Sequence, residues 1–373
     1  MRILTIFGTR PEAIKLAPVI QAISSTEGLE GLVCITGQHR EMLHQALALF
    51  DIGVDRDLDV MRHAQGLAET TAAVLTGLDA VMSDLRPDRV IVQGDTSTTF
   101  AASLAAYYHQ VPVAHVEAGL RTGDIYAPWP EEVNRKLTSA IADLHFAPTE
   151  RSRRALERES ISAESIVVTG NTVIDALLDV VGRMQTDPGF VAPVEERFRH
   201  LDPSRRLILV TGHRRENFDG GLVRVCEALR RLANRSDVEI VYAVHLNPNV
   251  QTAVQETLAD HPNVHLIEPQ EYLPFVYLMQ RASLIITDSG GVQEEAPSLG
   301  KPVLVTREKT ERPEAVEAGT VLLVGTDREK IVKEVERLLD DETAYRSMSV
   351  AHNPYGDGRA SGRIVEELLR RDL

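Results

Sequence analysis

The stretch LIITDSGGVQEE, residues 284–295, decides the fold class of this chain. The apolar run Leu284–Thr287 is typical of a strand buried on both faces of a sheet, and it leads through Ser289 and two glycines directly into a helical pattern. The first N–H groups of a helix have no partner within the helix, and glycines let an anion approach them closely. The stretch therefore predicts a strand–turn–helix unit of an α/β sheet, with either an anion site or a plain capping turn where the helix begins.

Apolar runs of the same kind recur along the chain and alternate with helical patterns such as Ala68–Leu85 and Glu329–Leu339, whose apolar residues are spaced by three and four. The further runs are Ile3–Phe7, Gly31–Thr36, Arg89–Gln93, Val111–Val116, Ser165–Val168, Leu207–Thr211, Val238–Val244, Val264–Leu266 and Val303–Val305. We therefore expect two doubly wound α/β domains with parallel sheets, whose ligands bind beyond the carboxyl ends of the strands.

The length of 373 residues exceeds what one compact core supports and favours two or three domains. We place the join near Val168–Thr172, so that residues 1–169 form an N-terminal domain and residues 170–354 a C-terminal domain. The polar stretch Gln185–Pro203 is predicted to be a loop within the second domain. A final helix, Ser361–Arg371, follows a glycine-rich turn and could pack on either domain.

Composition excludes several classes of protein. Forty basic against 55 acidic side chains leave a formal charge of −15, which argues against nucleic-acid binding because that requires a basic face. The chain shows no signal peptide and no apolar run near about 18 residues, so we expect a cytoplasmic protein without a membrane span. Cys34 and Cys226 are expected to be buried, reduced thiols. The 12 histidines lack the spacing of metal ligands, so no metal is predicted.

The first strand is followed directly by the turn GTRPE, residues 8–12. Proline suits the first turn of a helix, and the exposed amides of the turn could meet a phosphate together with Arg10. Lys15, one turn further along, extends this positive site or is simply solvated. Taken alone, the turn is equally an ordinary strand-to-helix connection.

Reactive side chains end three further strands. Asp95 and Glu117 lie at the tips of two strands in the first half, and His213 ends a strand in the second half. Each acid alone is more often a helix cap. Acids that follow neighbouring strands share one pocket, which suits proton transfer, so together these residues favour a reactive cleft between the domains.

The segment YAPWPEEVNR, residues 126–135, contains the only tryptophan of the chain, with a proline on each side. It predicts a stiff loop that enters a helix, with Glu131 and Glu132 in the first turn. Carboxylates are favoured there by the helix dipole in any case, so the segment alone does not distinguish a reactive acid from a surface glutamate.

Eight segments carry the motifs of a known family. They are FGTRPEA (7–13), QHREML (38–43), QGDT (93–96), HVEAGLR (115–121), PEEVNR (130–135), GHRREN (212–217), TDSGG (287–291) and ERPE (311–314). In order and spacing, and over nearly the whole length, the chain resembles the non-hydrolysing UDP-N-acetylglucosamine 2-epimerases of bacteria and archaea.

The resemblance implies a GT-B fold, in which two Rossmann-like domains face a deep cleft and a C-terminal helix, residues 355–373 or so, crosses back to the first domain. It implies reversible conversion of UDP-N-acetylglucosamine (UDP-GlcNAc) to UDP-N-acetylmannosamine (UDP-ManNAc) for surface polysaccharide synthesis. Members of the family use no metal and no nicotinamide cofactor, and they are generally homodimers. Bacterial members are activated by UDP-GlcNAc at a second site.

The chemistry that the resemblance implies explains the acids. Loss of UDP from carbon 1 with the proton of carbon 2 gives a 2-acetamidoglucal, and UDP then re-adds while a proton reaches the opposite face of carbon 2. Two proton-transfer groups and support for the diphosphate are required. By resemblance, Asp95, Glu117 and Glu131 are the acid/base candidates, and His213 lies near the leaving diphosphate.

Two further sets of residues follow from the resemblance. The substrate would be bound by Arg10, Lys15, the amides of Ser289, Gly290 and Gly291, Arg312, the uracil contacts Gln270 and Phe275, and the ribose ligand Glu295. The activating ligand would be bound by Gln38, Glu41, Arg214 and His245. Ala64 stands where the family pattern leads us to expect a basic residue, which predicts weaker activation or none.

Three other functions compete with this interpretation. A GT-B glycosyltransferase would share the fold and the UDP site but would need an acceptor pocket, which the segment at 130–135 does not favour. A hydrolysing epimerase would release UDP and free N-acetylmannosamine. A nucleotide-sugar sensor without activity is disfavoured because every expected acid is present.

Overall fold

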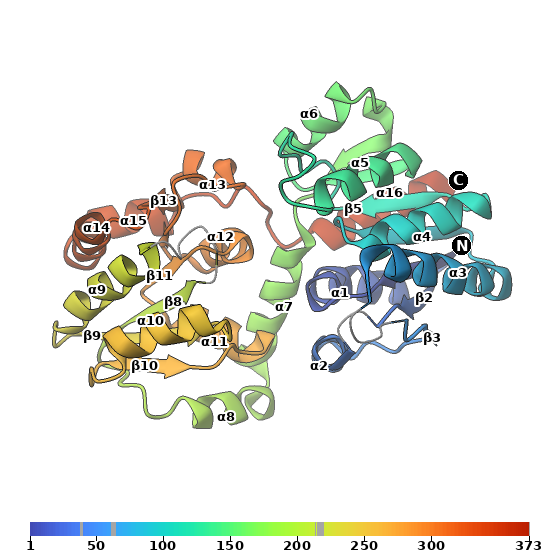
Figure 1. Cartoon of the computed structure of the whole chain (residues 1–373). Helices are drawn as coiled ribbons and strands as arrows, with labels where there is room; N and C mark the ends of the chain where they lie inside the picture. The colour runs from blue at the N-terminus through green and yellow to red at the C-terminus, as the bar shows by residue number, and fades with distance from the viewer. Residues whose placement is uncertain (38–39, 61–64, 213, 215–219, 373) are drawn as a thin grey trace. The chain divides into compact units, whose positions relative to one another are not determined.

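The computed structural model describes the chain except for residues 38–39, 61–64, 213, 215–219 and 373. It divides into two compact units. Unit 1 consists of Met1–Ala176 and Tyr355–Leu373, and unit 2 consists of Leu177–Pro354. The chain passes from unit 1 to unit 2 within helix α7, Thr172–Thr186 (Figure 1).

Unit 1 is built around a parallel sheet with the strand order β3-β2-β1-β4-β5-β6-β7. Its strands are β1 Arg2–Phe7, β2 Glu30–Ile35, β3 Arg56–Asp57, β4 Arg89–Gln93, β5 Val113–Val116, β6 Leu144–Ala147 and β7 Ile166–Val168. Strand β1 pairs with β2 on one side and with β4 on the other. The order of the strands therefore reverses between β1 and β4, and a ligand site is expected where that reversal occurs.

Helices cover both faces of this sheet. They are α1 Arg10–Ser24, α2 Arg40–Leu49, α3 Leu67–Leu85, α4 Ser97–Tyr108, α5 Glu131–Ile141, α6 Glu150–Arg158 and α16 Ala360–Asp372. Helices α3, α4 and α5 pack in a row, and α1 packs against α2 and α16 (Figure 1). Right-handed crossovers put these two groups on opposite faces, because the strand order advances in opposite directions from β1.

Unit 2 repeats the arrangement with the strand order β10-β9-β8-β11-β12-β13. Its strands are β8 Arg206–Gly212, β9 Val238–Val244, β10 Val264–Ile267, β11 Leu284–Thr287, β12 Val303–Val305 and β13 Val321–Leu323. Its helices are α8 Pro188–Arg197, α9 Gly221–Ala233, α10 Pro248–Leu258, α11 Tyr272–Arg281, α12 Gly290–Glu295, α13 Pro313–Glu317, α14 Arg328–Asp340 and α15 Glu342–Ser349. All of these strand pairs are parallel, and the order reverses between β8 and β11.

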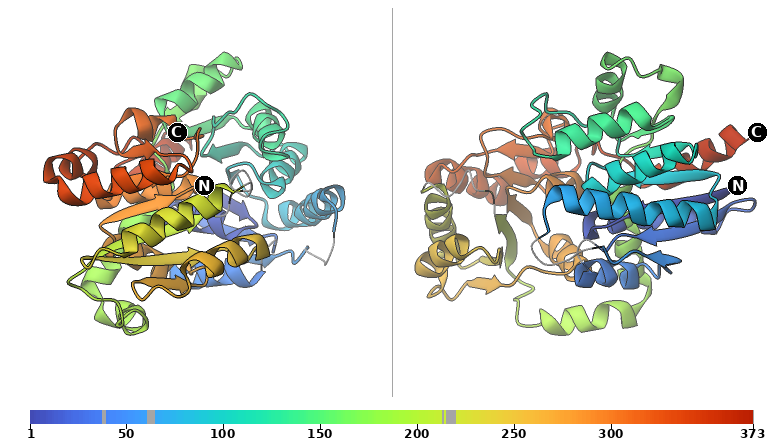
Figure 2. Two further views of the ribbon diagram at one scale, coloured as in Figure 1. Left: turned by 60° about the vertical axis from the view of Figure 1, so that its left-hand side comes forward. Right: turned by 45° about the vertical axis from the view of Figure 1, so that its right-hand side comes forward.

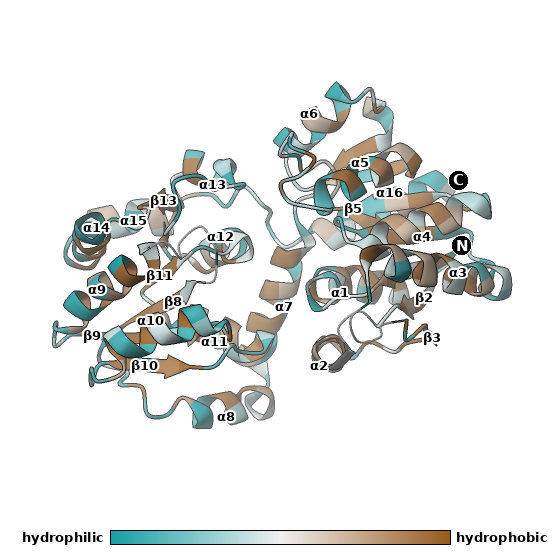
Figure 3. Cartoon of the chain, in the orientation of Figure 1, coloured by the Kyte–Doolittle hydropathy of each residue, from teal (hydrophilic) through white to brown (hydrophobic). Residues whose placement is uncertain are grey.

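Hydropathy follows these layers. Most strands are apolar, whereas helices such as α9 and α10 alternate between apolar and polar residues along their length (Figure 3). In unit 2, Ile208, Ile240 and Ile286 are fully buried on neighbouring strands. Each sheet is thus covered on both faces, which explains why its strands consist of continuous apolar runs.

The C-terminal helix returns to unit 1, as the resemblance predicted. The carboxylate of Asp175 accepts hydrogen bonds from the first backbone amides of α16, at Ala360 (3.2 Å) and Ser361 (2.8 Å). Arg363 donates to the carbonyl oxygen of Thr169 at 2.9 Å. The helix that ends at the label C lies beside the blue and cyan elements of unit 1 in Figure 1 and in the right-hand view of Figure 2.

One local prediction was wrong. The stretch Gln185–Pro203 is not a loop, because it contains the end of α7 and the whole of α8. Asp187 caps α8 by accepting the amide of Gly189 at 2.9 Å, and Val191 and Val194 are buried at helical spacing. The pair Asp187–Pro188 is a typical start of a helix, and the polar composition of the stretch obscured this signal.

Three strands of the sheets were not predicted. Strands β3, β6 and β13 were absent from the predicted set of strands, although each pairs in register with a neighbour. Strand β3 consists of two charged residues, and β6 and β13 are only four and three residues long, too short to stand out without the neighbouring strands. Within the described part of the chain, no helix is long and apolar enough to cross a membrane.

Candidate active site

The turn after β1 is organised by a buried glutamate. Glu12 lies in the first turn of α1, and one of its oxygens accepts the amides of Gly8 (3.0 Å) and Thr9 (2.7 Å). Its other oxygen accepts the hydroxyls of Thr96 (2.6 Å) and Thr99 (3.2 Å), which follow β4. Burial raises the pKa of Glu12, and these hydrogen bonds oppose that shift. Glu12 therefore ties together the two turns where the strand order reverses.

Glu117 is the most tightly held of the predicted acids. It follows β5 and is 7% exposed. Both of its oxygens accept hydrogen bonds from the ammonium of Lys15, at 2.6 and 2.7 Å. Gln93 and Asn171 donate their side-chain amides to the same carboxylate. Lys15, predicted as a substrate contact, is thus also the ion-pair partner of a candidate catalytic carboxylate.

The backbone of Glu117 adopts a left-handed conformation, with φ of 62°. Such a conformation costs about 1–2 kcal/mol for residues other than glycine. Two residues later Gly119 has φ of 90°, and a Cβ there would lie 2.3 Å from the carbonyl oxygen of Ser152, so this position requires glycine. Strained positions of this kind cluster at functional sites, where the surrounding structure holds them in place.

Asp95 lies just past β4 and is paired with Arg135 of α5, which also contacts Glu132 at 3.1 Å. Asn134 donates its side-chain amide to the backbone carbonyl of Asp95 at 3.0 Å. Burial raises the pKa of Asp95, the nearby charge of Glu117 raises it further, and Arg135 opposes both effects. A raised pKa makes a carboxylate a better proton acceptor, which is a property expected of a general base.

Glu131 and Glu132 begin α5, as predicted, but their surroundings differ. Glu132 is fully buried and accepts the amides of Thr122 and Gly123, both at 3.1 Å. Glu131 as a whole is only partly buried, but its Oε2 atom is buried and finds no hydrogen-bond partner among the described residues. Glu132 is therefore structural, whereas one oxygen of Glu131 is not used by the described part of the chain. The loop that precedes them exposes the side chains of Tyr126 and Trp129 by 74% and 62%.

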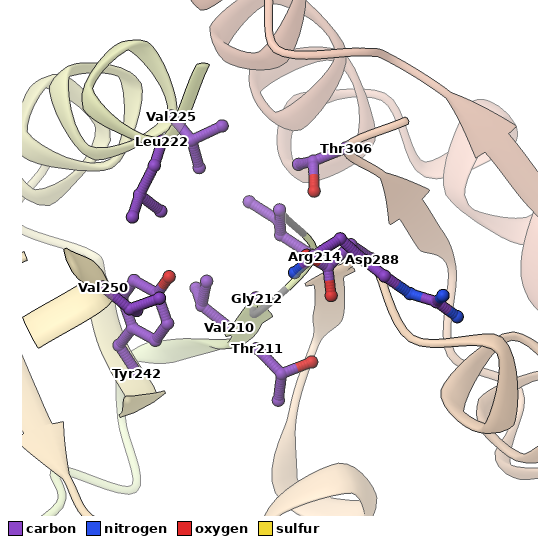
Figure 4. A pocket seen from close by; sticks show the side chains of 11 residues that line it. Val210, Thr211, Gly212, Arg214, Leu222, Val225, Tyr242, Val250, Asp288 and Thr306 are labelled. Carbon is purple, nitrogen blue, oxygen red and sulfur yellow. The ribbon is translucent and has the colours of Figure 1, made fainter. Parts of the chain in front are cut away.

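The corresponding point of unit 2 contains a small pocket at the carboxyl ends of β8 and β11. Leu222, Val250 and Tyr242 lie on one side of it, and Arg214 and Asp288 lie on the other (Figure 4). The buried Asp288 accepts the backbone amide of Arg214 at 2.8 Å. This contact holds the chain just after β8 beside the end of β11.

Gly212 ends β8 and lines this pocket. A Cβ at that position would lie 3.2 Å from the hydroxyl of Tyr242, a tight contact that only a small shift of the tyrosine would relieve. The glycines of α12 are different. Among the described residues, a Cβ at Gly290 would meet only the guanidinium of Arg312, at 3.8 Å, and one at Gly291 would meet Glu295 and Ser289 at 3.8 and 3.9 Å. These are ordinary contacts, so packing against the described residues does not explain the two glycines.

Two side chains of α12 hold Arg312 near the start of that helix. Glu294, 1% exposed, is paired with the guanidinium of Arg312. Gln293 accepts the hydroxyl of Thr310 at 2.6 Å, and that hydroxyl oxygen accepts the amide of Arg312 at 3.0 Å. A cationic group thus lies beside the helix N-terminus, where an anion would also be attracted by the free N–H groups.

The remaining predicted substrate residues of unit 2 are Glu295 at the end of α12, Gln270 just before α11 and Phe275 on α11. Glu295 is buried and accepts the hydroxyl of Tyr272 at 2.6 Å. Burial and the charge of Glu295 raise the pKa of that tyrosine. Gln270 is 8% exposed, and its Oε1 atom has no partner among the described residues. Phe275 is partly buried on α11.

Several predicted residues are not covered by these observations. His213, Gln38 and Ala64 lie outside the described residues, and so does the side chain of Glu41. Of the other residues predicted for an activating ligand, His245 is exposed and accepts the amide of Asn247 at 3.1 Å. The described part of the chain contains no group of three or more side chains that could hold a metal ion.

Comparison with known proteins assigns the family. The model of the UDP-N-acetylglucosamine 2-epimerase family matches residues 21–369. The chain belongs to this family. It is 58% identical to a UDP-N-acetylglucosamine 2-epimerase of Yersinia pestis over 374 aligned positions, which cover 100% of both chains.

Solved structures of UDP-GlcNAc 2-epimerases have the same fold as this family member. The enzyme from Neisseria meningitidis bound to UDP-GlcNAc superposes with a TM-score of 0.91 at 51% identity, covering 99% of this chain and 100% of that one. The enzyme from Methanocaldococcus jannaschii, in complex with UDP-GlcNAc and UDP, gives a TM-score of 0.81 at 35% identity with coverage of 99% and 100%. The predicted family and the predicted fold class, two Rossmann-like domains of the GT-B type, are thereby confirmed.

The structure also shows supporting residues that the sequence did not single out. Glu12, Gln93, Asn171 and Arg135 all contact a predicted site residue or the turns that carry it. Glu12 could have been recognised from the capping box that it forms with Thr9. The other three are ordinary polar residues in sequence, and only the strand order brings them to their partners.

Proposed function

We propose that this chain is a non-hydrolysing UDP-N-acetylglucosamine 2-epimerase, which reversibly inverts carbon 2 of UDP-GlcNAc to form UDP-ManNAc. The observation that carries the proposal is the group of carboxylates around the strand reversal of unit 1, where Glu117 is held by Lys15 and influences the pKa of Asp95. Membership of the epimerase family and 51% identity to an enzyme bound to UDP-GlcNAc support the substrate.

The reaction proceeds by elimination and re-addition. A carboxylate removes the proton of carbon 2, the electrons of the broken C–H bond form a double bond to carbon 1, and the bond from carbon 1 to the diphosphate oxygen breaks. The products of this step are UDP and 2-acetamidoglucal. UDP then re-adds to carbon 1 while a proton is delivered to the other face of carbon 2. No water is consumed, and no oxidant is needed.

In this proposal unit 1 supplies the proton-transfer groups. Asp95, Glu117 and Glu131 exchange protons with the substrate, and Arg10 and Lys15 stabilise negative charge on the diphosphate and on the carboxylates. The raised pKa of Asp95 supports its part in an exchange that must run in both directions. One oxygen of Glu131 has no hydrogen-bond partner among the described residues, which supports a carboxylate that is not committed to a structural contact.

Unit 2 binds the UDP moiety in the same proposal. The amides of Ser289, Gly290 and Gly291 and the guanidinium of Arg312 would bind phosphate, with His213 near the bond that breaks. The absence of a tight contact at either glycine, among the described residues, supports the close approach of a ligand. Glu295 would accept the ribose hydroxyls, and Gln270 and Phe275 would contact the uracil.

Several wider properties belong to the proposal and follow from the family resemblance. The product would supply surface polysaccharide synthesis in the cytoplasm, and the chain would act as a homodimer. UDP-GlcNAc would also bind at a second site formed by Gln38, Glu41, Arg214 and His245. The M. jannaschii complex that contains both UDP-GlcNAc and UDP supports the presence of two ligand sites in related enzymes.

One experiment tests the proposed function directly. The protein is incubated with UDP-GlcNAc in deuterated water, and the mixture is followed by NMR. We expect UDP-ManNAc with deuterium at carbon 2, and exchange into the remaining UDP-GlcNAc as the reaction reverses.

Two other outcomes would contradict the proposal. Formation of UDP and free N-acetylmannosamine as the only products would identify a hydrolysing enzyme. No change until a sugar or alcohol acceptor is added would identify a glycosyltransferase.

A further inference from the structure

Arg135 lies between two carboxylates that have different surroundings. Its guanidinium contacts Asp95 through one terminal nitrogen and Glu132 through the other. The Arg135 side chain is 10% exposed, that of Glu132 is 0% exposed, and that of Asp95 is 28% exposed. In this triad of Glu132, Arg135 and Asp95, only the Asp95 end therefore reaches solvent or a ligand.

Backbone amides hold Glu132, the buried end of the triad, in place. Glu132 accepts the amides of Thr122 and Gly123 in addition to its contact with Arg135. A planar guanidinium with two bound carboxylates has little freedom to rotate, because its donors form a rigid fork. Glu132 thus holds the guanidinium in one orientation, and the guanidinium holds the Asp95 carboxylate.

The neighbouring residue of α5 acts on the same turn. Asn134 donates its side-chain amide to the backbone carbonyl of Asp95, so α5 holds both the main chain and the side chain of this residue. Buried ion pairs contribute little net stability, since the loss of hydration offsets the attraction. Stability alone is therefore a weak explanation for a buried triad that ends on a candidate proton-transfer group.

We infer that Arg135 is a positioning residue, which orients the Asp95 carboxylate for proton transfer and is itself held in place by Glu132. This inference rests on the proposed epimerase activity. Arg135 does not need to touch the substrate in this role. Its contribution is to keep Asp95 in one rotamer and to balance its charge.

The charges that face Asp95 come from three elements. They are Arg135 from α5, Lys15 from α1 and Glu117 after β5. Lys15 is already paired with Glu117 at 2.6 Å. Without Arg135, Asp95 would face the charge of Glu117 with less compensation, so its pKa would rise further. Whether the reaction step needs Asp95 ionised or protonated, the limb of the pH profile that it sets would move to higher pH.

The test uses a charge-balanced double variant, Glu132→Gln with Arg135→Met, in the full-length protein. Removing both partners avoids leaving Glu132 buried without a counterion. Initial rates with UDP-GlcNAc are measured from pH 5 to about pH 10. We expect kcat to fall about 10- to 100-fold, as misplacement of a reacting group by about 1 Å does, with KM changed much less. We also expect one limb of the kcat profile to move to higher pH.

Strand β4 provides a matched control. Arg89 lies at the opposite end of this strand from Asp95 and forms two hydrogen bonds with Asp143, at 2.8 and 3.0 Å. Arg89 is also 8% exposed. The double variant Arg89→Met with Asp143→Asn removes a comparable ion pair from the same sheet. We expect it to keep the kcat profile of the unmodified protein even if its stability falls.

A conservative variant separates charge from shape. Arg135→Lys keeps the positive charge but cannot contact both carboxylates with the same fixed geometry. We expect its pH profile to stay close to that of the unmodified protein while kcat is reduced. A profile that moves as far as in the double variant would overturn the role of the charge.

The outcomes distinguish the inference from the proposed function. If the unmodified protein forms no UDP-ManNAc, the proposed function fails. If it does, but the Glu132/Arg135 variant retains its kcat and its pH limbs, or matches the Arg89/Asp143 variant in both, the positioning role of Arg135 is wrong. A lower kcat with a shifted limb in the Glu132/Arg135 variant alone supports the inference.

Discussion

Glu117 shows how one residue combines several constraints. Its carboxylate accepts two hydrogen bonds from Lys15 and one each from Gln93 and Asn171, while its backbone stays in the left-handed region. These four hydrogen bonds come from three residues in different parts of unit 1, and they offset the backbone strain and fix the direction of the side chain. Rigid support of this kind is what a group that must transfer a proton to one carbon atom requires.

Replacing the acids singly tests their roles. Asp95→Asn, Glu117→Gln and Glu131→Gln should each lower turnover of UDP-GlcNAc by about 10²-fold or more, which is the usual effect of losing a general acid or base. Asp143→Asn, which changes an acid remote from these residues, should leave turnover near normal. Rates are measured by NMR or by a coupled assay for UDP-ManNAc. Near-normal turnover in any one of the three variants removes that residue from the proposed mechanism.

Gly290 gives a second test at the scale of one residue. Among the described residues a Cβ at Gly290 would meet only Arg312, at 3.8 Å, so Gly290→Val should fold normally, but its branched side chain would occupy the position proposed for phosphate. We expect the Kd for UDP to rise about 10-fold or more, since overpacking costs about 1–3 kcal/mol. Titration calorimetry measures this change. Gly182→Val on α7, where a Cβ meets nothing within 4 Å, serves as the control and should bind UDP normally.

At the scale of elements, the start of α1 depends on Glu12. Glu12→Ala would leave the amides of Gly8 and Thr9 without their acceptor in a buried turn. We expect the free energy of unfolding to fall by about 3 kcal/mol, the upper end of the cost of unpaired buried donors. Urea unfolding measures this loss. Glu69 forms a similar capping contact with Gly66 on the surface, and Glu69→Ala should cost much less. Equal losses would show that burial of Glu12 does not matter.

Two buried histidines face each other on β5 and β6. His115 and His145 are paired in register, and burial lowers the pKa of His115 to about 3 and that of His145 to about 4. Both are therefore neutral in the folded protein near pH 5, whereas in the unfolded chain they bind protons below about pH 6.5. Their contribution to stability is complete above that pH and is lost as the pH falls toward the folded values.

The pH dependence of stability tests this pair. We expect the free energy of unfolding to decrease from pH 6.5 to pH 4, with each histidine adding about 1.4 kcal/mol per pH unit at most. His145→Gln should reduce that slope in urea unfolding measured at several pH values. His44→Gln, which changes an exposed histidine, should not reduce it. An unchanged slope in the His145 variant would assign the effect to other groups.

At the scale of the whole molecule, unit 1 is built from two separate parts of the chain. The turn at Gly170 and the segment at Tyr355 lie side by side, and the amide of Asn171 donates to the carbonyl of Tyr355 at 2.6 Å. Helix α16 then packs on α1 and buries Ile364 and Leu368. Unit 1 therefore includes the last residues of the chain, which follow the whole of unit 2 in the sequence.

Asp175 connects these two parts and provides the corresponding test. Asp175→Ala removes the acceptor for the first amides of α16, and loss of such a cap costs about 1–2 kcal/mol. We expect faster hydrogen exchange and faster protease cleavage within residues 355–373, with the sheet of unit 2 unaffected. Asp341→Ala, which removes the cap of α15, should leave α16 protected. If α16 is equally protected in both variants, Asp175 does not hold it.

The sequence by itself determined the features that depend only on residues adjacent in the chain, such as the boundaries of several strands. Four predicted runs match their strands at both ends: Arg89–Gln93, Val238–Val244, Leu284–Thr287 and Val303–Val305. Their boundaries could be predicted because a continuous apolar run bounded by turn residues is a local signal for a strand. The motifs, their order and their spacing were sufficient for the family. Composition misled at α8, where a polar stretch concealed a capped helix.

Only the tertiary structure decided which side chains meet. Lys15 and Glu117 are 102 positions apart, and Arg135 and Asp95 are 40 apart, yet both pairs form because β1, β4 and β5 are neighbours in the sheet. The strand order follows from how all the apolar faces are buried together, and no local pattern contains it. The sequence therefore named the acids, and the fold decided which of them are held, by which partners, and with what effect on their charge.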